Sequence, residues 1–390
     1  MFTKIITFIT EAFNSSDAQK ISERKTLFSP QDMLPAWSNP NTVHLRITTE
    51  EFNPNDDRSL YYLNLPHASL KRHIFNNLPQ DFRVEIFRAK LENLENSLND
   101  ILNKRYKLSV SQVSLCNVID LSSRPGNSVF ELHFKGKENL KLILKYCTPF
   151  GDTGSRSDDT ASGIQKGLIE NESFFSRYLT LSGIDTVMEV AKPTDRMTFL
   201  EYIEGVTSNK LFNKTELLPE YHPYYDSMLI QLSHIAAASD LIGKCDRSLN
   251  LLNNQSVFGN ARINQDYKIF PIDNDALFTP SWDGLRDSNL RPDYRIGKSE
   301  TAFLLTGKNL QRDKEIFRKE YLETVAIIRQ NTGQIRQLIQ EIYTDTAVIK
   351  RIEIFNNYVQ KSDEEIMDWL DIILSDEALA SSRQFIFDNN

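Results

Sequence analysis

The chain has 390 residues, a length that favours two or three domains and allows a large buried core. Hydrophobic residues make up 40% and charged residues 25%, as in ordinary soluble globular proteins, and the net charge of -8 argues against a general nucleic-acid-binding protein. The cysteines Cys116, Cys147 and Cys245 have neither zinc-ligand nor thioredoxin spacing, and unpaired thiols favour a cytosolic location.

The N-terminal part of the chain predicts an extension with little regular structure before its first long helix. Residues 1–13 predict a short amphipathic helix that could not span a membrane and lacks a signal-peptide cleavage site. Residues 14–60 predict an irregular arm, because four prolines interrupt a polar stretch. Residues 80–105 carry apolar side chains every three or four positions, which predicts one amphipathic helix. Its apolar face consists of Val84, Phe87, Leu91, Leu94, Leu98 and Leu102.

The rest of the chain predicts strands and one helix, followed by a mostly helical region. Alternating or apolar runs predict strands over 113–121, 129–134, 141–147, 187–191 and 198–202. A polar loop over 150–163 precedes a helix over 168–181, and later helices are predicted over 223–239, 311–343, 345–360 and 363–381. Pro223 is expected in the first turn of its helix. This order indicates an α+β fold of two lobes, with a nucleotide crevice expected where the lobes meet. No segment is long and apolar enough to span a membrane.

Three polar residues near the middle of the chain match the requirements of phosphoryl transfer. Asp246 lies beside Arg247 in a predicted loop, Asn250 follows four residues later, and Asp273 follows the apolar run K-I-F-P-I. One carboxylate could orient a hydroxyl group, while an amide and a second carboxylate could hold Mg²⁺ against ATP phosphates. Each residue also has an ordinary interpretation as an ion pair, a turn residue or a strand-end cap. Their mutual spacing favours one site.

Two charged residues further upstream could complete such a site. Lys145 ends the strand L-I-L-K, with Lys141 as an alternative on the same face. Glu172 is expected to open a helix, N-E-S-F-F, with Glu170 as an alternative. The ordinary interpretations are a solvent-facing lysine on an edge strand and a first-turn glutamate favoured by the helix dipole.

Together with the run M-T-F-L-E-Y-I-E-G from Met197, these motifs resemble the protein-kinase-like superfamily. The resemblance covers residues 110–280 and points to the atypical branches that include phosphoinositide kinases, HipA and actin-fragmin kinase. It extends to bacterial effector kinases that respond to host inositol polyphosphate. The implied fold is a two-lobed kinase-like fold, with an N-terminal extension over 1–105, an N-lobe over 106–205, and over 206–390 a C-lobe that ends in a helical region.

The resemblance implies a role for each residue in ATP-dependent phosphorylation of a protein hydroxyl. Lys145 would contact the ATP phosphates, and Glu172 would hold Lys145 in place. Asp246 would serve the attacking hydroxyl. The remaining implied roles are metal ligation of Mg²⁺ or Mn²⁺ by Asn250 and Asp273, and adenine binding by the backbone of Glu201, Tyr202 and Ile203.

The sequence departs from the family pattern in ways that bear on catalytic rate more than on fold. Ser248 stands where the family usually has His, and Asn250 is one residue closer to Asp246 than usual, so Asn253 and Asn254 stay alternative metal ligands. Asp275 could add a carboxylate. The glycine loop is reduced to S-S-R-P-G-N, so residues 150–156 are an alternative cover for the phosphates. A pseudokinase acting as a nucleotide- or anion-binding module, a kinase-fold AMP transferase and a lipid kinase remain open.

Four basic clusters stand out from the acidic background. They are Lys71–His73, Lys104–Lys107, Arg318–Lys319 and Lys350–Arg351. Such clusters are usually solvated helix surface. The resemblance adds the expectation that some of them converge on an inositol polyphosphate or phosphoinositide, since phosphates favour several Arg and Lys donors. It also implies that, if the chain is a secreted effector, it acts in the host cytoplasm or at a membrane surface.

Overall fold

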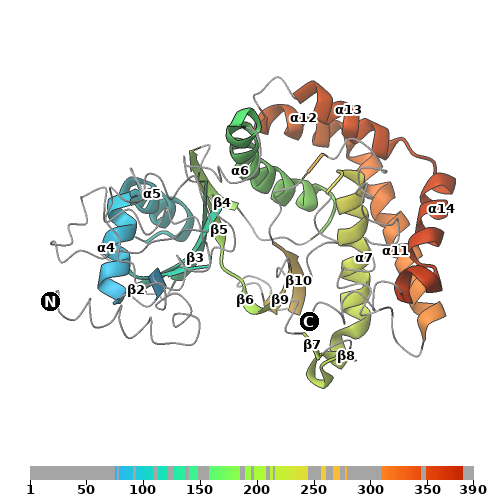
Figure 1. Ribbon diagram of the computed structural model, residues 1–390, viewed down its shortest axis with the longest axis horizontal. Coiled ribbons are helices and arrows are strands. Elements are labelled where there is room, and N and C mark those ends of the chain that lie inside the picture. Colours follow the sequence, from blue (N-terminus) through green and yellow to red (C-terminus); the bar gives the residue numbers. More distant parts are fainter. Residues whose placement is uncertain are drawn as a thin grey trace, which may run out of the picture. The chain divides into compact units, whose positions relative to one another are not determined.

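The computed structural model describes part of the chain, and Figure 1 shows its helices and strands. The described residues are 75–76, 79–90, 94–108, 113–121, 127–136, 140–147, 158–184, 189–194, 197–207, 211–213, 216–244, 256–260, 267–272, 277–278, 305, 309–343 and 348–380. The chain divides into two compact units, one formed by Met1–Ile169 and Glu189–Tyr202, the other by Glu170–Met188 and Ile203–Asn390. The helix and arm predicted within residues 1–60 lie outside the described residues.

The first unit contains a five-stranded antiparallel sheet with the order β1-β2-β3-β5-β4. The strands are β1 Val113–Asp120, β2 Asn127–Gly136, β3 Leu140–Cys147, β4 Glu189–Thr194 and β5 Met197–Glu201. All five predicted strands are therefore present, with shifted ends. The order places β3 in the middle of the sheet, paired with β2 on one side and β5 on the other.

One face of this sheet packs against two helices, α4 (Gln80–Lys90) and α5 (Leu94–Tyr106). Alternate residues of a strand share a face, and Leu140, Leu142 and Leu144 of β3 all belong to this buried cluster. The prediction of one helix over 80–105 is wrong, because the structure has two helices there. The apolar spacing gives no sign of the break, since both helices bury their apolar residues in the same cluster.

The segment before α4 is tied to the end of β1. The side-chain amide of Asn76 donates to the carbonyl oxygen of Asp120 at 2.9 Å and accepts from the Asp120 N–H at 2.8 Å. Arg83 in turn donates to the carbonyl oxygen of Asn76 at 3.1 Å. Asn76 thus replaces a strand neighbour for Asp120, and the unit's edge strand gains two hydrogen bonds there.

In the second unit the helices α7 (Tyr225–Leu241) and α11 (Leu310–Gln330) lie side by side (Figure 1). Three further helices follow: α12 (Thr332–Ile342), α13 (Val348–Val359) and α14 (Asp363–Ile373), with a helical turn over 376–380. The prediction of one helix over 311–343 is wrong, because the chain turns at Asn331. The Asn331 side-chain amide donates to the carbonyl oxygens of Leu181 and Ile327 at 3.0 and 3.1 Å. The expected placement of Pro223 is also wrong, because it lies in a 3-10 helix, Pro219–Tyr224, that precedes α7.

Helix α6 (Asp158–Leu181) begins earlier than the sequence predicts. Residues 158–163, expected to be loop, are helical. Their content of Thr, Ser and Gly gives a low helix propensity, so the pattern indicates a loop there. The part of α6 from Glu170 onward belongs to the second unit and contributes Phe174, Phe175 and Leu179 to its core.

The second unit also contains two small antiparallel sheets. The three-stranded sheet has the order β10-β9-β6 and consists of β6 Glu204–Thr207, β9 Ser256–Asn260 and β10 Tyr267–Pro271. The pair β7 (Phe212–Asn213) and β8 (Glu216–Leu217) forms the other. The backbone N–H of Ile269 on β10 donates to the Gln231 side-chain oxygen of α7 at 2.7 Å. Helices and antiparallel sheets occur in both units, so the predicted α+β class is confirmed. None of the described helices could cross a membrane.

Candidate active site

Lys145 is buried on the central strand β3. Its backbone neighbours are Val129 on β2 and Thr198 on β5, and the residue is 6% exposed. Because Leu142 and Leu144 face the apolar cluster, Lys145 lies on the opposite face of the sheet. The alternative of a solvent-facing lysine on an edge strand is therefore wrong. Lysine is rarely buried to this extent unless its charge interacts with another polar or charged group.

Lys141, the alternative to Lys145, is engaged elsewhere on that face. Its Nζ lies 3.5 Å from Oε1 of Glu131 and 4.5 Å from the centroid of the Tyr202 ring. The same Glu131 oxygen is 2.7 Å from Nε2 of His133. The Lys141 side chain is 37% exposed, so Lys145 is the more deeply buried cation of the strand.

A neighbour of Lys145 that the sequence analysis missed is Thr198. This residue is fully buried, and its hydroxyl donates to Oε2 of Glu189 on β4 at 3.0 Å. The available signal was a single polar residue inside the apolar run M-T-F-L. The hydrogen bond links β4 and β5 on the face of the sheet that carries Lys145.

Glu172 and Glu170 are both buried within α6, at 3% and 5% exposure. Glu172 does not open a helix, because α6 begins at Asp158, and the interpretation as a first-turn glutamate is wrong. Because both glutamates are buried, Glu172 and its alternative Glu170 both remain candidates for the predicted partner of Lys145. Since Lys145 and Glu172 belong to different compact units, their pairing stays a prediction.

The predicted adenine-binding segment lies where the chain leaves the first unit and enters the second. Glu201 is the last residue of β5, and the chain leaves the first unit after Tyr202 and enters the second at Ile203. Ile203 is buried, and β6 starts at the next residue. A connecting segment of this kind is what the kinase-like interpretation requires at Glu201–Ile203, and its contact with adenine stays a prediction.

Several predicted site residues lie outside the described residues, although the chain on either side of them is described. These residues are Asp246, Ser248, Asn250, Asn253, Asn254, Asp273 and Asp275, together with the turn around Gly126 and the segment 150–156. The backbone N–H of Phe278 donates to the carbonyl oxygen of Ile242 at 3.0 Å. The segment that leads into Asp246 and the segment that follows Asp273 therefore lie against each other. Among the residues that the structure describes, no three His, Cys, Asp or Glu side chains could hold a metal ion.

The C-terminal end of α7, whose last residue Leu241 is five positions before Asp246, has a defined hydrogen-bond geometry. Gly243 adopts φ +67°, and its N–H donates to the carbonyl oxygen of Asp240 at 3.1 Å. The Lys244 N–H donates to the carbonyl oxygen of Ser239 at 2.8 Å. These two bonds form a Schellman motif, in which glycine relieves the strain of the left-handed conformation.

Lys244 is a second buried lysine that the sequence analysis missed. It is 1% exposed, and its Nζ lies 5.7 Å from the centroid of the Phe175 ring of α6. The residue after the glycine of a Schellman motif usually packs back against its helix, and that position was the available signal. Lys244 precedes the predicted catalytic Asp246 by two positions in the sequence, and it brings a cation into the core of the second unit.

The last turns of α7 are also held by side chains from other helices. The Tyr321 hydroxyl of α11 donates to Oδ2 of Asp240 at 2.9 Å, and the Tyr178 hydroxyl of α6 donates to the carbonyl oxygen of Ala238 at 3.0 Å. Burial raises the pKa of Tyr178 far above its usual value, so the hydroxyl stays protonated and continues to donate.

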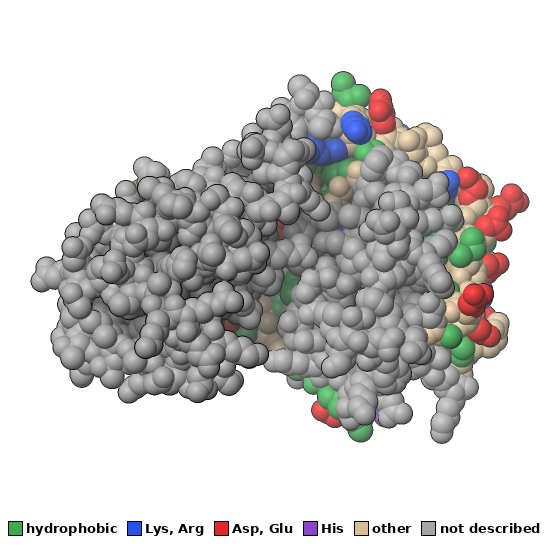
Figure 2. All heavy atoms as spheres, viewed as in Figure 1, with side chains coloured by type: hydrophobic (Ala, Val, Ile, Leu, Met, Phe, Trp, Pro, Cys, Tyr) green, Lys and Arg blue, Asp and Glu red, His purple; other side chains and the backbone are tan. Residues whose placement is uncertain are grey.

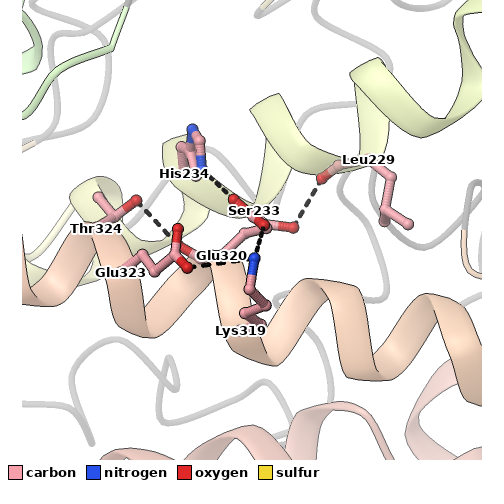
Figure 3. Close-up of polar contacts among 7 residues, drawn as sticks. All are labelled: Leu229, Ser233, His234, Lys319, Glu320, Glu323 and Thr324. Atoms are coloured by element: carbon pink, nitrogen blue, oxygen red, sulfur yellow. Dashed lines mark hydrogen bonds and ion pairs between the residues drawn. The ribbon is translucent and has the colours of Figure 1, made fainter.

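A polar network joins α7 to α11 (Figure 3). Oε2 of Glu320 lies 3.0 Å from Nε2 of His234, and its Oε1 lies 3.0 Å from Nζ of Lys319. Burial alone would raise the pKa of Glu320, but the hydrogen bonds from Lys319 and His234 outweigh burial and hold this pKa below its usual value. The network links α7 to α11 at His234, and α7 leads toward the Asp246 segment.

Several described members of the basic clusters are engaged within the protein. Arg318 lies 2.8 Å from Asp371, Lys104 lies 2.7 Å from Asp100, and the guanidinium of Arg351 lies 4.1 Å from the centroid of the Tyr343 ring. Figure 2 shows acidic side chains gathered along the edge of the second unit that carries α14. The exposed acidic residues of α14 include Asp363, Glu364, Glu365, Asp368 and Asp371. This surface would repel a phosphate-rich ligand.

Comparisons with known proteins give likenesses in structure only. No family model matches the chain, and no curated protein matches it. The proinflammatory kinase CtkA of Helicobacter pylori aligns at 14% identity and a TM-score of 0.36, covering 65% of this chain and 92% of CtkA. The Rio2 kinase of Chaetomium thermophilum, solved with ADP, Mg²⁺ and phosphoaspartate, aligns at 10% identity and 0.30, covering 86% and 96%. An apo pseudokinase aligns at 11% identity and 0.28, covering 65% and 90%. Because these identities and TM-scores are low, the fold is judged from the chain's own elements.

Proposed function

We propose that this chain is an atypical kinase that transfers the γ-phosphoryl group of ATP to a protein hydroxyl. The observation that carries the proposal is Lys145, a lysine buried at 6% exposure on the middle strand of an antiparallel sheet. Kinases place the phosphate-contacting lysine on the third strand of such a sheet and its glutamate partner on the helix that follows. Here β3 carries Lys145, and α6, with its buried Glu172, is the next element of the chain.

The order of the remaining elements supports the same two-lobed kinase-like fold. Glu201 and Ile203 lie where the chain crosses from one compact unit to the other, and their backbone groups would bind adenine. Asp246 follows the fixed end of α7 and would orient the substrate hydroxyl. Asp273 comes two residues after β10, with Asn250 between α7 and β9.

The metal ligands proposed for Mg²⁺ or Mn²⁺ are Asn250 and Asp273. Carboxylate and amide oxygens are the ligands that Mg²⁺ prefers, and a bound ion would neutralise charge on the phosphates. The hydrogen bond between Phe278 and Ile242 supports the proposal, because it joins a residue that precedes Asn250 in the chain to one that follows Asp273. Asn253 and Asn254 stay alternatives to Asn250.

The proposal is tested with ATP labelled at the γ- or the α-phosphate and a mixture of host-cell proteins as substrate, in Mg²⁺ or Mn²⁺. We expect transfer of the γ label only, and a loss far greater than about tenfold in Asp273→Ala, because positioning and charge supply most of the rate. Lys135→Ala, on the exposed end of β2, is the control and should keep the wild-type rate. Transfer of the α label alone would make the chain an AMP transferase, and no transfer with nucleotide binding would make it a binding module.

We further propose an inositol polyphosphate as an activator. This part of the proposal is supported by the resemblance to effector kinases alone. The described basic residues add no support, since several of them are engaged within the protein. Titrating inositol hexakisphosphate into the labelling reaction should raise the rate at micromolar concentration. A rate that does not change over that titration, or that rises only with phosphoinositide vesicles, would contradict the soluble activator. Action inside a host cell stays a prediction from the same resemblance.

A further inference from the structure

Tyr343 occupies a central place in the second unit. It caps the C-terminal end of α12, where its N–H donates to the carbonyl oxygen of Ile339 at 3.1 Å, and it is 1% exposed. Its hydroxyl donates to Oδ1 of Asn171 on α6 at 2.6 Å. Asn171 is the residue directly before Glu172, so a C-terminal helix reaches the turn of α6 that carries the proposed partner of Lys145.

The Tyr343 ring also contacts the segment that follows Asp273. Its centroid lies 5.6 Å from that of Phe174 on α6 and 5.5 Å from that of Phe278, with the Phe278 ring nearly perpendicular to it. Phe174 and Phe278 are themselves 5.3 Å apart. Three rings from three distant segments therefore form one cluster, at separations where aromatic pairs attract each other.

Phe278 is held in this cluster by more than its ring. It adopts φ +62°, a conformation that costs energy for any residue other than glycine and persists only when surrounding contacts impose it. Its N–H donates to Ile242, and the guanidinium of Arg351 on α13 lies 5.9 Å from its ring and 4.1 Å from that of Tyr343. The cation over two ring faces adds a second C-terminal helix to the cluster.

We propose that Tyr343 is a positioning residue that holds the Glu172 turn of α6 and the segment after Asp273 in a fixed relation to each other. The inference rests on the proposed function, since it gives these two segments their roles. The ring alone would suffice for an apolar core. The buried hydroxyl needs a partner, and its bond to Asn171 fixes the rotation of α6 about its axis in a way that a phenylalanine would not.

The test compares Tyr343→Phe with a matched control, Tyr225→Phe. The Tyr225 hydroxyl also donates at 2.6 Å to a side-chain oxygen on another helix of the same unit, that of Asp313. The two variants should lose similar thermal stability. Only Tyr343→Phe should lower kcat with ATP, by about three- to tenfold as expected for one hydrogen bond, with KM for ATP nearly unchanged. Asn171→Ala should lower kcat to a similar extent, and the double variant should lose no more than either single one.

A second measurement separates this inference from the proposed function. Amide hydrogen exchange of residues 170–176 and 277–278 should accelerate in Tyr343→Phe and in Asn171→Ala, and stay unchanged in Tyr225→Phe. If the wild type transfers no phosphate, the kinase proposal fails and the exchange result alone decides the positioning role. Equal kcat in the two tyrosine variants of an active protein, or unchanged exchange at both segments, would overturn the inference.

Discussion

The two compact units fix their candidate site residues by different means. In the first unit, Lys145 is placed by the regular alternation of a central strand, which puts its side chain on the face opposite Leu142 and Leu144. In the second unit, the described residues on either side of the Asp246 and Asp273 segments, such as Ile242 and Phe278, are held by a helix end, aromatic rings and single hydrogen bonds between distant parts of the chain. A single substitution should therefore suffice to disable the candidate site in the first unit, whereas the second unit should respond to several packing contacts.

The largest expected effect is that of Lys145→Met, which tests the first half of this comparison. Methionine fills the buried volume without the charge, so phosphoryl transfer should fall by at least about a hundredfold while the fold is kept. The γ-label assay and thermal unfolding measure the two quantities separately. A Lys145→Met protein with the wild-type rate would remove the basis for the kinase assignment.

The next largest effect is that of Phe174→Ala, which tests the second half. Phe174 is fully buried between Phe278 and Tyr343, so truncation should cost about 3–5 kcal/mol of unfolding free energy, measured by urea denaturation. Ile349→Ala on α13, at a residue 69% exposed, should change stability by less than about 0.5 kcal/mol. Equal losses in both variants would mean that the aromatic cluster does not stabilise the unit.

A smaller effect, with a defined pH dependence, is expected for Glu320→Gln. Its pKa in the folded protein lies below its usual value of 4.5, so the stabilisation is complete above about pH 4.5 and is lost as the pH falls through the folded pKa. The variant should be less stable than wild type by about 1 kcal/mol at pH 7, and the two should converge in acid. Glu323→Gln, which removes an exposed partner of Lys319, should show little of this dependence. A gap that persists in acid would assign the effect to packing.

The smallest effects come from two glycines and should have opposite signs. Gly243 has a left-handed backbone, so Gly243→Ala should destabilise the protein by about 1 kcal/mol and loosen the end of α7. Gly333 lies in α12, where an added methyl group meets nothing within 4 Å, and Gly333→Ala should stabilise by about 0.5–1 kcal/mol. Thermal unfolding of the two variants checks the signs, and the same sign in both would contradict the assigned backbone roles.

The sequence predicts the regular part of this molecule well, for reasons visible in particular elements. Strand alternation locates β3 and the apolar cluster around Leu142 and Leu144, and the periodicity of α13 reports its buried face. The breaks between α4 and α5 and at Asn331 were missed, because apolar spacing continues across them. The buried Lys244 and the contact of Tyr343 with Asn171 could not be predicted, because both depend on tertiary packing between segments far apart in the chain.

The docking of α4 and of Asn76 has a practical consequence for how the protein is cut for expression. Phe75 and Phe87 lie within about van der Waals reach of the Phe130 ring, with centroids 6.0 and 5.1 Å from it, and form part of the first unit's interior. A shortened version starting at residue 106 would leave that side of the sheet open to water and its edge strand without the two Asn76 bonds. Recombinant fragments should therefore begin ahead of Phe75.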